Sequence, residues 1–280
     1  GRENISQNQQ NAEVRTMLEI KNIYKTFNPG TINEKVALNG LSLKLNEGDF
    51  VTVIGGNGAG KSTMLNAVAG VWPVDEGQII IDGTDVTKLS EYKRAAYLGR
   101  VFQDPMTGTA ATMGIEENLA LAKRRGKTRF LRSGITKAER EEYKELLKIL
   151  NLGLEDRLTS KVGLLSGGQR QALTLLMATL QKPKLLLLDE HTAALDPKTA
   201  AKVLDITDRI VNRDHLTTLM ITHNMKDAIA HGNRLIMMMN GKIILDIQGE
   251  EKKKLTVKQL LDKFEEASGE EFSNDSAILG

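Results

Sequence analysis

The feature that most constrains the fold is a glycine-rich run, Gly55 to Thr63, which directly follows the apolar segment 50–54. Its glycine spacing and its Lys-Ser pair match the phosphate-binding loop pattern GxxxxGK[ST]. The apolar segment predicts a buried strand, and residues 63–69 predict a helix that Gly70 ends. A turn that binds nothing is the alternative, but a strand before and a helix after favour a loop whose N–H groups surround an anion. The segment therefore predicts a phosphate site at the end of a buried strand.

A second motif, LSGGQ at Leu165 to Gln169, follows the loop about a hundred residues later. Five specified residues seldom recur by chance in a chain of this length. In that order the two motifs resemble the ATP-binding cassette (ABC) ATPases, and the resemblance covers residues 17–247. It implies an α/β P-loop NTPase fold, in which a RecA-like core with a mixed sheet carries an antiparallel β subdomain and an inserted helical subdomain. It also implies that the chain binds ATP and Mg²⁺.

Two acids follow a second apolar run. Residues 184–188 predict another buried strand, which ends at Asp189 and Glu190. Paired acids at a strand end most often start a loop or cap a helix, but after these two motifs we predict chemistry instead. We expect Asp189 to hold Mg²⁺, usually through water, and Glu190 to polarise the attacking water.

The family resemblance assigns two further catalytic positions. Gln103, in Val-Phe-Gln-Asp-Pro, corresponds to the residue that senses Mg²⁺ and the attacking water and that links to a permease. His223, after the apolar run 216–221, corresponds to the histidine whose ring contacts the γ-phosphate. The predicted catalytic residues are Glu190, His223 and Gln103; the predicted Mg²⁺ ligands are Ser62, Gln103 and Asp189; and the predicted ATP-binding residues are Phe27, Gly55, Asn57, Gly58, Gly60, Lys61, Ser62, Thr63, Ser166, Gly168, Gln169 and Asp196.

Two positions leave alternatives open. Phe27, in Tyr-Lys-Thr-Phe, aligns best with the aromatic residue that stacks on adenine in the family, and stacking needs only a π face. Tyr24 competes for that position, and core packing is the alternative for both rings. Directly after Glu190 stands His191, where the family commonly carries proline or a small residue. We expect a partly exposed loop histidine there.

The composition narrows the class of protein. A chain of 280 residues with 40% hydrophobic content has enough apolar side chains for one large domain or two small ones. No run approaches 18 apolar residues, so no membrane-spanning helix is predicted, and the polar start lacks the apolar segment of a signal peptide. The sequence has no cysteine, which excludes disulfides and thiolate metal sites. A net charge of +2 gives no case for a nucleic-acid partner.

The pattern along the chain predicts three regions. Residues 1–16 are a polar N-terminal tail (an upstream tail or a cloning remnant), residues 17–250 the ABC ATPase domain with its helical subdomain at about 104–163, and residues 251–280 a C-terminal helix and polar tail. Smaller predictions are β-rich segments at 18–23, 36–45 and 78–82, helices at 137–150, 170–180 and 255–264, a helix capped by Asp196, and a hairpin turn at Asn240-Gly241.

The resemblance also implies partners. In this family the phosphate loop and the LSGGQ motif of one subunit face opposite directions, so Ser166 would complete a site on a second copy or on a paralogous cassette. Transmembrane permease subunits and a substrate-binding lipoprotein are implied as well, which would hold the chain at the cytoplasmic face of the cell membrane. We expect residues 103–119, with Met106, Met113 and Ile115, to form the groove that receives the permease, although such residues could equally be subdomain core.

The predicted function is therefore that of an ATP-hydrolysing transporter subunit. Residues 108–113 and 190–196 resemble a subgroup of amino-acid-type importers, for tryptophan or tyrosine, which favours solute uptake. The rival class is a soluble ABC ATPase, such as one in iron–sulfur assembly. A cassette that binds ATP without hydrolysing it is disfavoured, because Glu190 and His223 are both present.

Overall fold

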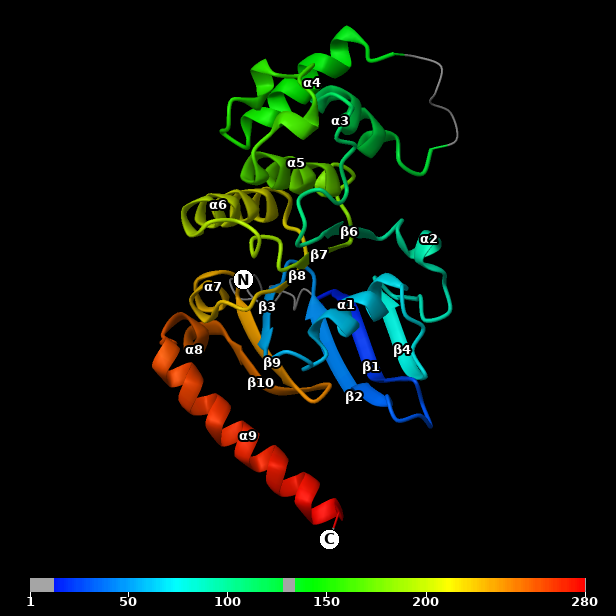
Figure 1. The fold of residues 1–280 in the computed structure, drawn as a ribbon, viewed down its shortest axis with the longest axis vertical. Coiled ribbons are helices and arrows are strands. Elements are labelled where there is room, and N and C mark those ends of the chain that lie inside the picture. Colours follow the sequence, from blue (N-terminus) through cyan, green and yellow to red (C-terminus); the bar gives the residue numbers. More distant parts are fainter. Residues whose placement is uncertain (1–12, 128–133, 280) are drawn as a thin grey trace, which may run out of the picture.

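The phosphate-loop strand lies near the middle of a six-stranded sheet (Figure 1). The computed structural model describes residues 13–127 and 134–279, so most of the predicted tail at 1–16 lies outside the described residues. In spatial order the strands are β10 (Lys242–Gln248), β9 (Arg234–Met239), β3 (Phe50–Gly55), β8 (Thr218–Ile221), β7 (Leu185–Asp189) and β6 (Leu98–Val101). The pairs from β9 to β6 are parallel, and β10 is antiparallel to β9. The mixed sheet is therefore confirmed.

This topology explains where the site forms. The carboxyl ends of parallel strands meet at one edge of a sheet, and ligands bind beyond that edge. Each of β3, β8, β7 and β6 delivers one of the predicted site segments immediately after its last residue. At the same edge, beside the phosphate loop, Asn240 and Gly241 both have positive φ and connect β9 to β10, which confirms the predicted hairpin turn.

A second, antiparallel sheet covers the first helix. Its order is β2 (Lys35–Asn46), β1 (Thr16–Phe27), β4 (Glu76–Ile81) and β5 (Thr84–Asp85). One buried cluster joins Leu18 and Ile20 of β1, Met64 and Leu65 of α1 (Lys61–Ala69), and Val53 of the large sheet. Since α1 packs on both sheets, the antiparallel subdomain fixes the helix that begins at the phosphate loop.

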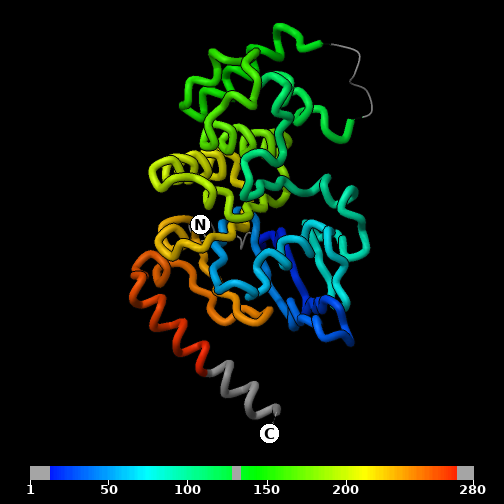
Figure 2. The backbone as a smooth tube through the Cα atoms, viewed as in Figure 1, coloured from blue at the N-terminus to red at the C-terminus, as the bar shows by residue number. Residues whose placement is uncertain are grey.

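Helices cover the face of the large sheet that lies opposite α1. They also form one end of the molecule, which is the upper part of Figures 1 and 2. A second cluster packs Leu173 and Leu176 of the LSGGQ helix against Leu186 and Leu188 of β7. The elements of this region are α3 (Ile115–Arg124), α4 (Lys137–Lys148), the 3₁₀ turns Leu154–Asp156 and Val162–Leu164, α5 (Gly167–Thr179) and α6 (Pro197–Asp214). The short helix α2 (Glu91–Arg94) lies apart from them, where Arg94 donates to carbonyls of α1. The predicted helices at 137–150 and 170–180 agree with α4 and α5 within a few residues.

The C-terminal region departs from its prediction. After α7 (Met225–Ala230) and α8 (Gly249–Lys253) comes α9, Val257–Leu279, which is much longer than the helix predicted at 255–264. Thr256 and Gln259 cap its start reciprocally, and Leu260 is buried against the large sheet. Beyond Phe264 the sequence is polar but contains no proline, and Gly269 costs a helix only about 1 kcal/mol, so the helix continues. Among the described helices, none combines the length and the apolar character that crossing a bilayer would require.

Candidate functional site

The phosphate loop joins β3 to α1 through backbone that only glycine permits. Gly55 has φ +153°, and a Cβ there would lie 2.4 Å from the carbonyl oxygen of Met238. Gly60 has φ +99°, and its Cβ would lie 2.5 Å from the carbonyl oxygen of Ala37. No side chain caps the start of α1, so its first N–H groups are available to an anion. The loop can therefore bind phosphate through its backbone.

Lys61 adds charge to the same place. The side chain is 9% exposed, and its Nζ donates to the carbonyl oxygens of Gly55 and Gly56. Burial lowers the pKa of the Lys61 ammonium, while the nearby Glu190 and Asp189 carboxylates act to raise it. The phosphate loop and the end of β7 are thus electrostatically coupled, as one site requires.

The two acids occupy different backbone environments. Asp189 ends β7, and burial raises the pKa of its carboxyl, opposed by the guanidinium of Arg100. Glu190 has φ +49°, an uncommon conformation for a residue with a side chain, and its N–H donates to the Ile221 carbonyl at 3.1 Å. Such backbone strain is typical of functional sites, because surrounding contacts must hold it.

Gln103 and His223 lie on either side of Glu190 along the sheet edge. Gln103 follows β6, Glu190 follows β7 and His223 follows β8, and these strands are adjacent in that order. The Gln103 and His223 side chains are exposed. The fold therefore brings the predicted catalytic residues to neighbouring strand ends, beside the phosphate loop after β3. Their individual roles stay predictions.

Arg100 of β6 was missed by the sequence reasoning. Its Nη2 lies 3.8 Å from the Asp189 carboxylate and donates to Asn66 Oδ1 at 2.6 Å, and its guanidinium lies 4.6 Å from the centroid of the Phe102 ring. Burial lowers the pKa of Arg100. The signal was a lone cation within the short strand Leu98–Val101, just before the predicted Gln103 position. Arg100 therefore offsets part of the charge of Asp189.

The LSGGQ motif forms the start of α5. Ser166 is its N-cap and shares a capping box with Gln169, at 3.2 Å and 3.1 Å. A Cβ on Gly168 would lie 2.3 Å from Thr199 Cγ2 of α6, so this glycine allows the two helices to approach closely. Ser166 is exposed, and Asp196, also exposed, caps α6 by accepting from Thr199 N at 3.0 Å. A helix N-terminus is thus presented at the surface.

The aromatic position remains open. Phe27 ends β1 and packs edge-on against Trp72, with ring centroids 5.3 Å apart, and Lys25 Nζ lies 5.4 Å from its centroid. Tyr24 is 38% exposed, and its hydroxyl covers Gly40. Both rings are partly accessible, so stacking of Phe27 on adenine stays a prediction.

His191 corrects the sequence-based expectation. It is 1% exposed rather than partly exposed, because the segment after β7 passes beneath α5 and α6. Its Nε2 lies 2.9 Å from Thr207 Oγ1, and that hydroxyl donates its own hydrogen to the Val203 carbonyl. Nε2 therefore carries the proton and donates. Burial, with a smaller effect of His231, lowers the pKa of His191 to about 4.

This burial predicts a pH-dependent stability. The folded-state pKa of about 4 lies below the unfolded value of 6.5, so the unfolded chain binds more protons as pH falls through that window. We expect the free energy of unfolding to fall by about 2 kcal/mol more in the wild type than in His191→Gln between pH 7.5 and pH 5. Urea unfolding at both pH values measures it, and equal losses would show that His191 is not buried as a neutral ring.

Comparisons with known proteins agree with this geometry. A family profile described as ABC transporter matches residues 38–193. The tyrosine transport ATP-binding protein of Clostridioides difficile (strain R20291) is 47% identical over 90% of this chain and 100% of the relative. The spermidine/putrescine import ATP-binding protein PotA of Haemophilus ducreyi is 34% identical over 84% of this chain, which spans 58% of that longer relative.

Solved structures give the same result for the fold. The ATP-binding cassette MJ1267, in its ADP conformation, matches with a TM-score of 0.72 at 28% identity, over 89% of this chain and 98% of that one. The cassette MJ0796, a dimer in a post-hydrolysis state with ADP and Pi, matches with a TM-score of 0.69 at 30% identity, over 83% and 98%.

Proposed function

Because the chain belongs to the ABC transporter family and is the ATP-hydrolysing subunit of a transporter, we propose that it works as one of a pair of cassettes. The pair drives solute uptake through separate permease subunits. The observation that supports the mechanism best is the shared sheet edge. There the phosphate loop, Glu190 and His223 follow neighbouring strands, whereas Ser166 presents a helix start elsewhere on the surface. The second cassette, a copy or a paralogue, would cover the phosphate loop with its own Ser166.

Each residue then has a defined task. Loop N–H groups and Lys61 bind the β- and γ-phosphates, and Glu190 accepts a proton from the attacking water at its carboxylate. The Gln103 amide orients that water, and the His223 ring donates towards the γ-phosphate. Glu190 is held at the strand end by its surroundings, since its N–H donates to the Ile221 carbonyl at 3.1 Å and its positive φ persists only where neighbouring contacts hold it.

The donor set fits Mg²⁺. The Ser62 hydroxyl, the Gln103 amide and the Asp189 carboxylate are oxygen donors, which Mg²⁺ prefers. Among the side chains that the structure describes, within residues 13–127 and 134–269, there is no cluster of three or more His, Asp or Glu residues able to hold a metal alone. That suits an ion bound through few side chains together with phosphate oxygens and water. When bound, Mg²⁺ would neutralise charge on the β- and γ-phosphates.

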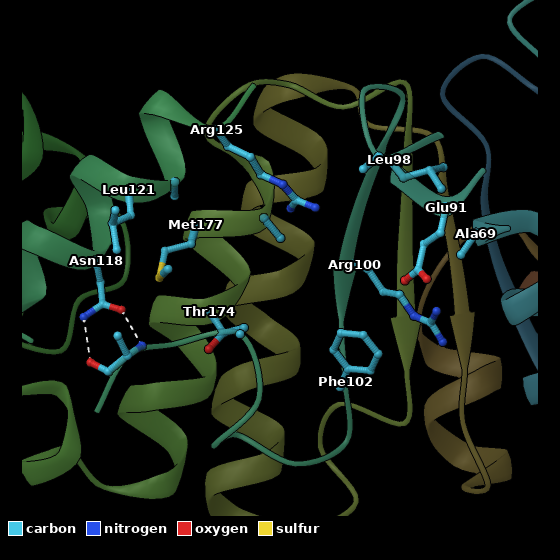
Figure 3. Close-up of a pocket in the computed structure, with 15 residues that line it drawn as sticks. Ala69, Glu91, Leu98, Arg100, Phe102, Asn118, Leu121, Arg125, Thr174 and Met177 are labelled. Atoms are coloured by element: carbon cyan, nitrogen blue, oxygen red, sulfur yellow. Dashed lines mark hydrogen bonds between the residues drawn. The ribbon is translucent and has the colours of Figure 1, made fainter. Parts of the chain in front are cut away.

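A cavity offers the permease a place to dock. It measures about 480 Å³ and lies between α3 and α5 on one side and α2 and β6 on the other (Figure 3). Arg100, Phe102, Asn118, Leu121 and Met177 line it, among others. In its wall, the Asn118 amide exchanges hydrogen bonds with the Ala110 backbone at 2.8 Å and 3.1 Å. We propose that a short permease helix inserts here.

The groove residues expected from the sequence need correction. Ile115 is fully buried in the helical core, so it cannot face a partner, because it starts α3 on the helix face that packs inward. Met113 is half-buried, whereas Met106 is 60% exposed and its Sδ accepts from Arg170 Nη1 at 2.7 Å. Leu121, which is 52% exposed and lines the cavity, is the better probe of this surface.

The substrate proposal rests on one relative. The tyrosine transport ATP-binding protein aligns over its whole length at 47% identity. We therefore propose that the permease partner takes up an aromatic amino acid, delivered by a substrate-binding lipoprotein, and that the chain sits at the cytoplasmic face of the membrane.

The coupling surface can be tested directly. Leu121→Asp should leave the basal ATPase rate of the isolated chain within about twofold of wild type, because the side chain is exposed, but it should abolish transport. The measurement is uptake of labelled tyrosine by vesicles that contain the chain and its permease. Ile32→Asp, at a fully exposed position on the antiparallel subdomain, is the matched control and should transport normally. Loss of fold and ATPase together in Leu121→Asp would identify core rather than interface.

A further inference from the structure

Gln171 of α5 bonds two carbonyls that come from different segments. The residue is fully buried, and its Nε2 donates to the Phe102 carbonyl at 2.8 Å and to the His191 carbonyl at 2.5 Å. Two carbonyls fix the orientation of the amide, since Oε1 in their place would meet only acceptors. One side chain thus joins the ends of β6 and β7 to the LSGGQ helix.

The two carbonyls are adjacent to the predicted catalytic residues. Phe102 directly precedes Gln103, and His191 directly follows Glu190. The Phe102 bond therefore restrains the peptide that joins Phe102 to Gln103, and the His191 bond restrains the backbone one peptide beyond Glu190. The restraint matters most at Glu190, whose φ of +49° is held by its neighbours.

The position of Gln171 on α5 connects these two hydrogen bonds to the LSGGQ motif. Ser166 caps the start of this helix. Gln171 lies five residues after Ser166, which is just over one helical turn along α5. A displacement of the helix start, when a second cassette presses a nucleotide against Ser166, would therefore move the Gln171 amide with it. The backbone near Gln103 and Glu190 would then move as well.

A packing role alone does not account for this residue. Its Oε1 is buried and has no hydrogen-bond partner among the described residues, a costly arrangement that an apolar side chain of the same size would avoid. What the glutamine provides is the double donor, and an apolar side chain cannot supply it.

We propose that Gln171 is a positioning residue, which holds Gln103 and Glu190 in register with the LSGGQ helix through its two carbonyl bonds. The inference rests on the proposed roles of Gln103 and Glu190. It assigns to Gln171 no contact with ATP, so nucleotide binding should be independent of it.

The test separates turnover from binding. Gln171→Met keeps the volume and removes the donors, and Gln171→Glu keeps the shape but, because burial against two carbonyls favours the protonated acid, offers one donor in place of two. In both, kcat for ATP hydrolysis should fall about 10- to 100-fold, as for a misplaced catalytic group, while KM and the calorimetric Kd for ATP stay within about twofold of wild type. Thr179→Val is the control, since this buried hydroxyl of α5 bonds carbonyls of its own helix.

Each outcome is decisive. Normal kcat in Gln171→Met, or equal losses in kcat and ATP affinity with a lower Tm, would overturn the proposal. Failure of both variants to fold would also overturn it, because Gln171 would then be a structural residue. The wild type and Glu190→Gln are assayed in parallel. A Glu190→Gln protein that still hydrolyses ATP would refute the proposed site itself, and an inactive one leaves the Gln171 result to be judged alone.

Discussion

Replacing Glu190 with Gln is expected to lower the ATPase rate by about 10²- to 10⁴-fold, the usual cost of losing a general base. The amide keeps the shape of the side chain but cannot accept the proton of the attacking water. ATP affinity should stay near that of the wild type, because in the proposed site the phosphates bind to Lys61 and to the loop N–H groups, which the substitution leaves in place. Phosphate release from the purified chain measures the rate, and calorimetry measures the affinity.

Two comparisons sharpen this result. Glu141→Gln changes an exposed acid on α4, far from the sheet edge in sequence and in the fold, and should hydrolyse ATP normally. Lys61→Ala should instead lose ATP binding itself, because it removes the cation beside the phosphates. Near-normal turnover in Glu190→Gln would remove this carboxylate from the role of general base.

Placing arginine at Ser166 is expected to abolish the pairing of two cassettes around ATP. Ser166 is exposed at the start of α5, where the helix dipole and free N–H groups favour a phosphate. A long side chain there would fill the space that the γ-phosphate of the opposite site needs. The variant should still bind ATP, because the predicted nucleotide-binding residues Lys61, Ser62 and Phe27 are unchanged.

The substitution also removes a helix cap, which calls for a matched control. Loss of an N-cap costs about 1 kcal/mol of stability wherever it occurs. Thr136 caps α4 with Glu139 in the same reciprocal way that Ser166 caps α5 with Gln169. Thr136→Arg therefore loses an equivalent cap at a position with no proposed contact to nucleotide. It should retain ATP-dependent pairing, which would attribute the effect of Ser166→Arg to its place in the site.

Sequence patterns predicted the parts of the fold that depend on local chemistry. The phosphate loop is an example, since Gly55 and Gly60 are required by backbone geometry that no other residue tolerates. The cap at Asp196 is another, because a short polar side chain before a helix bonds its first N–H groups. The mixed sheet and its antiparallel neighbour were predicted from the family resemblance and confirmed.

The features of the site that could not be predicted from the sequence depend on contacts between segments far apart in the chain. Arg100 forms an ion pair with Asp189, which is 89 positions away in the sequence. No local sequence pattern predicts that ion pair. The burial of His191 arises because α5 and α6 close over a loop that reads as exposed. Gln171 lies only two residues after the LSGGQ motif, but its importance appears once the Phe102 and His191 carbonyls are seen to converge on it.

The central claim is that two chains sandwich ATP between a phosphate loop and an opposing Ser166. The mass of Glu190→Gln in solution tests this claim most directly. Size-exclusion chromatography with light scattering should give a dimer with ATP and a monomer with ADP, because ADP lacks the γ-phosphate that both chains would hold. Adding Ser166→Arg to the same background should return the ATP sample to a monomer that still binds nucleotide. A dimer of equal stability with ADP, or one that survives Ser166→Arg, would contradict the account.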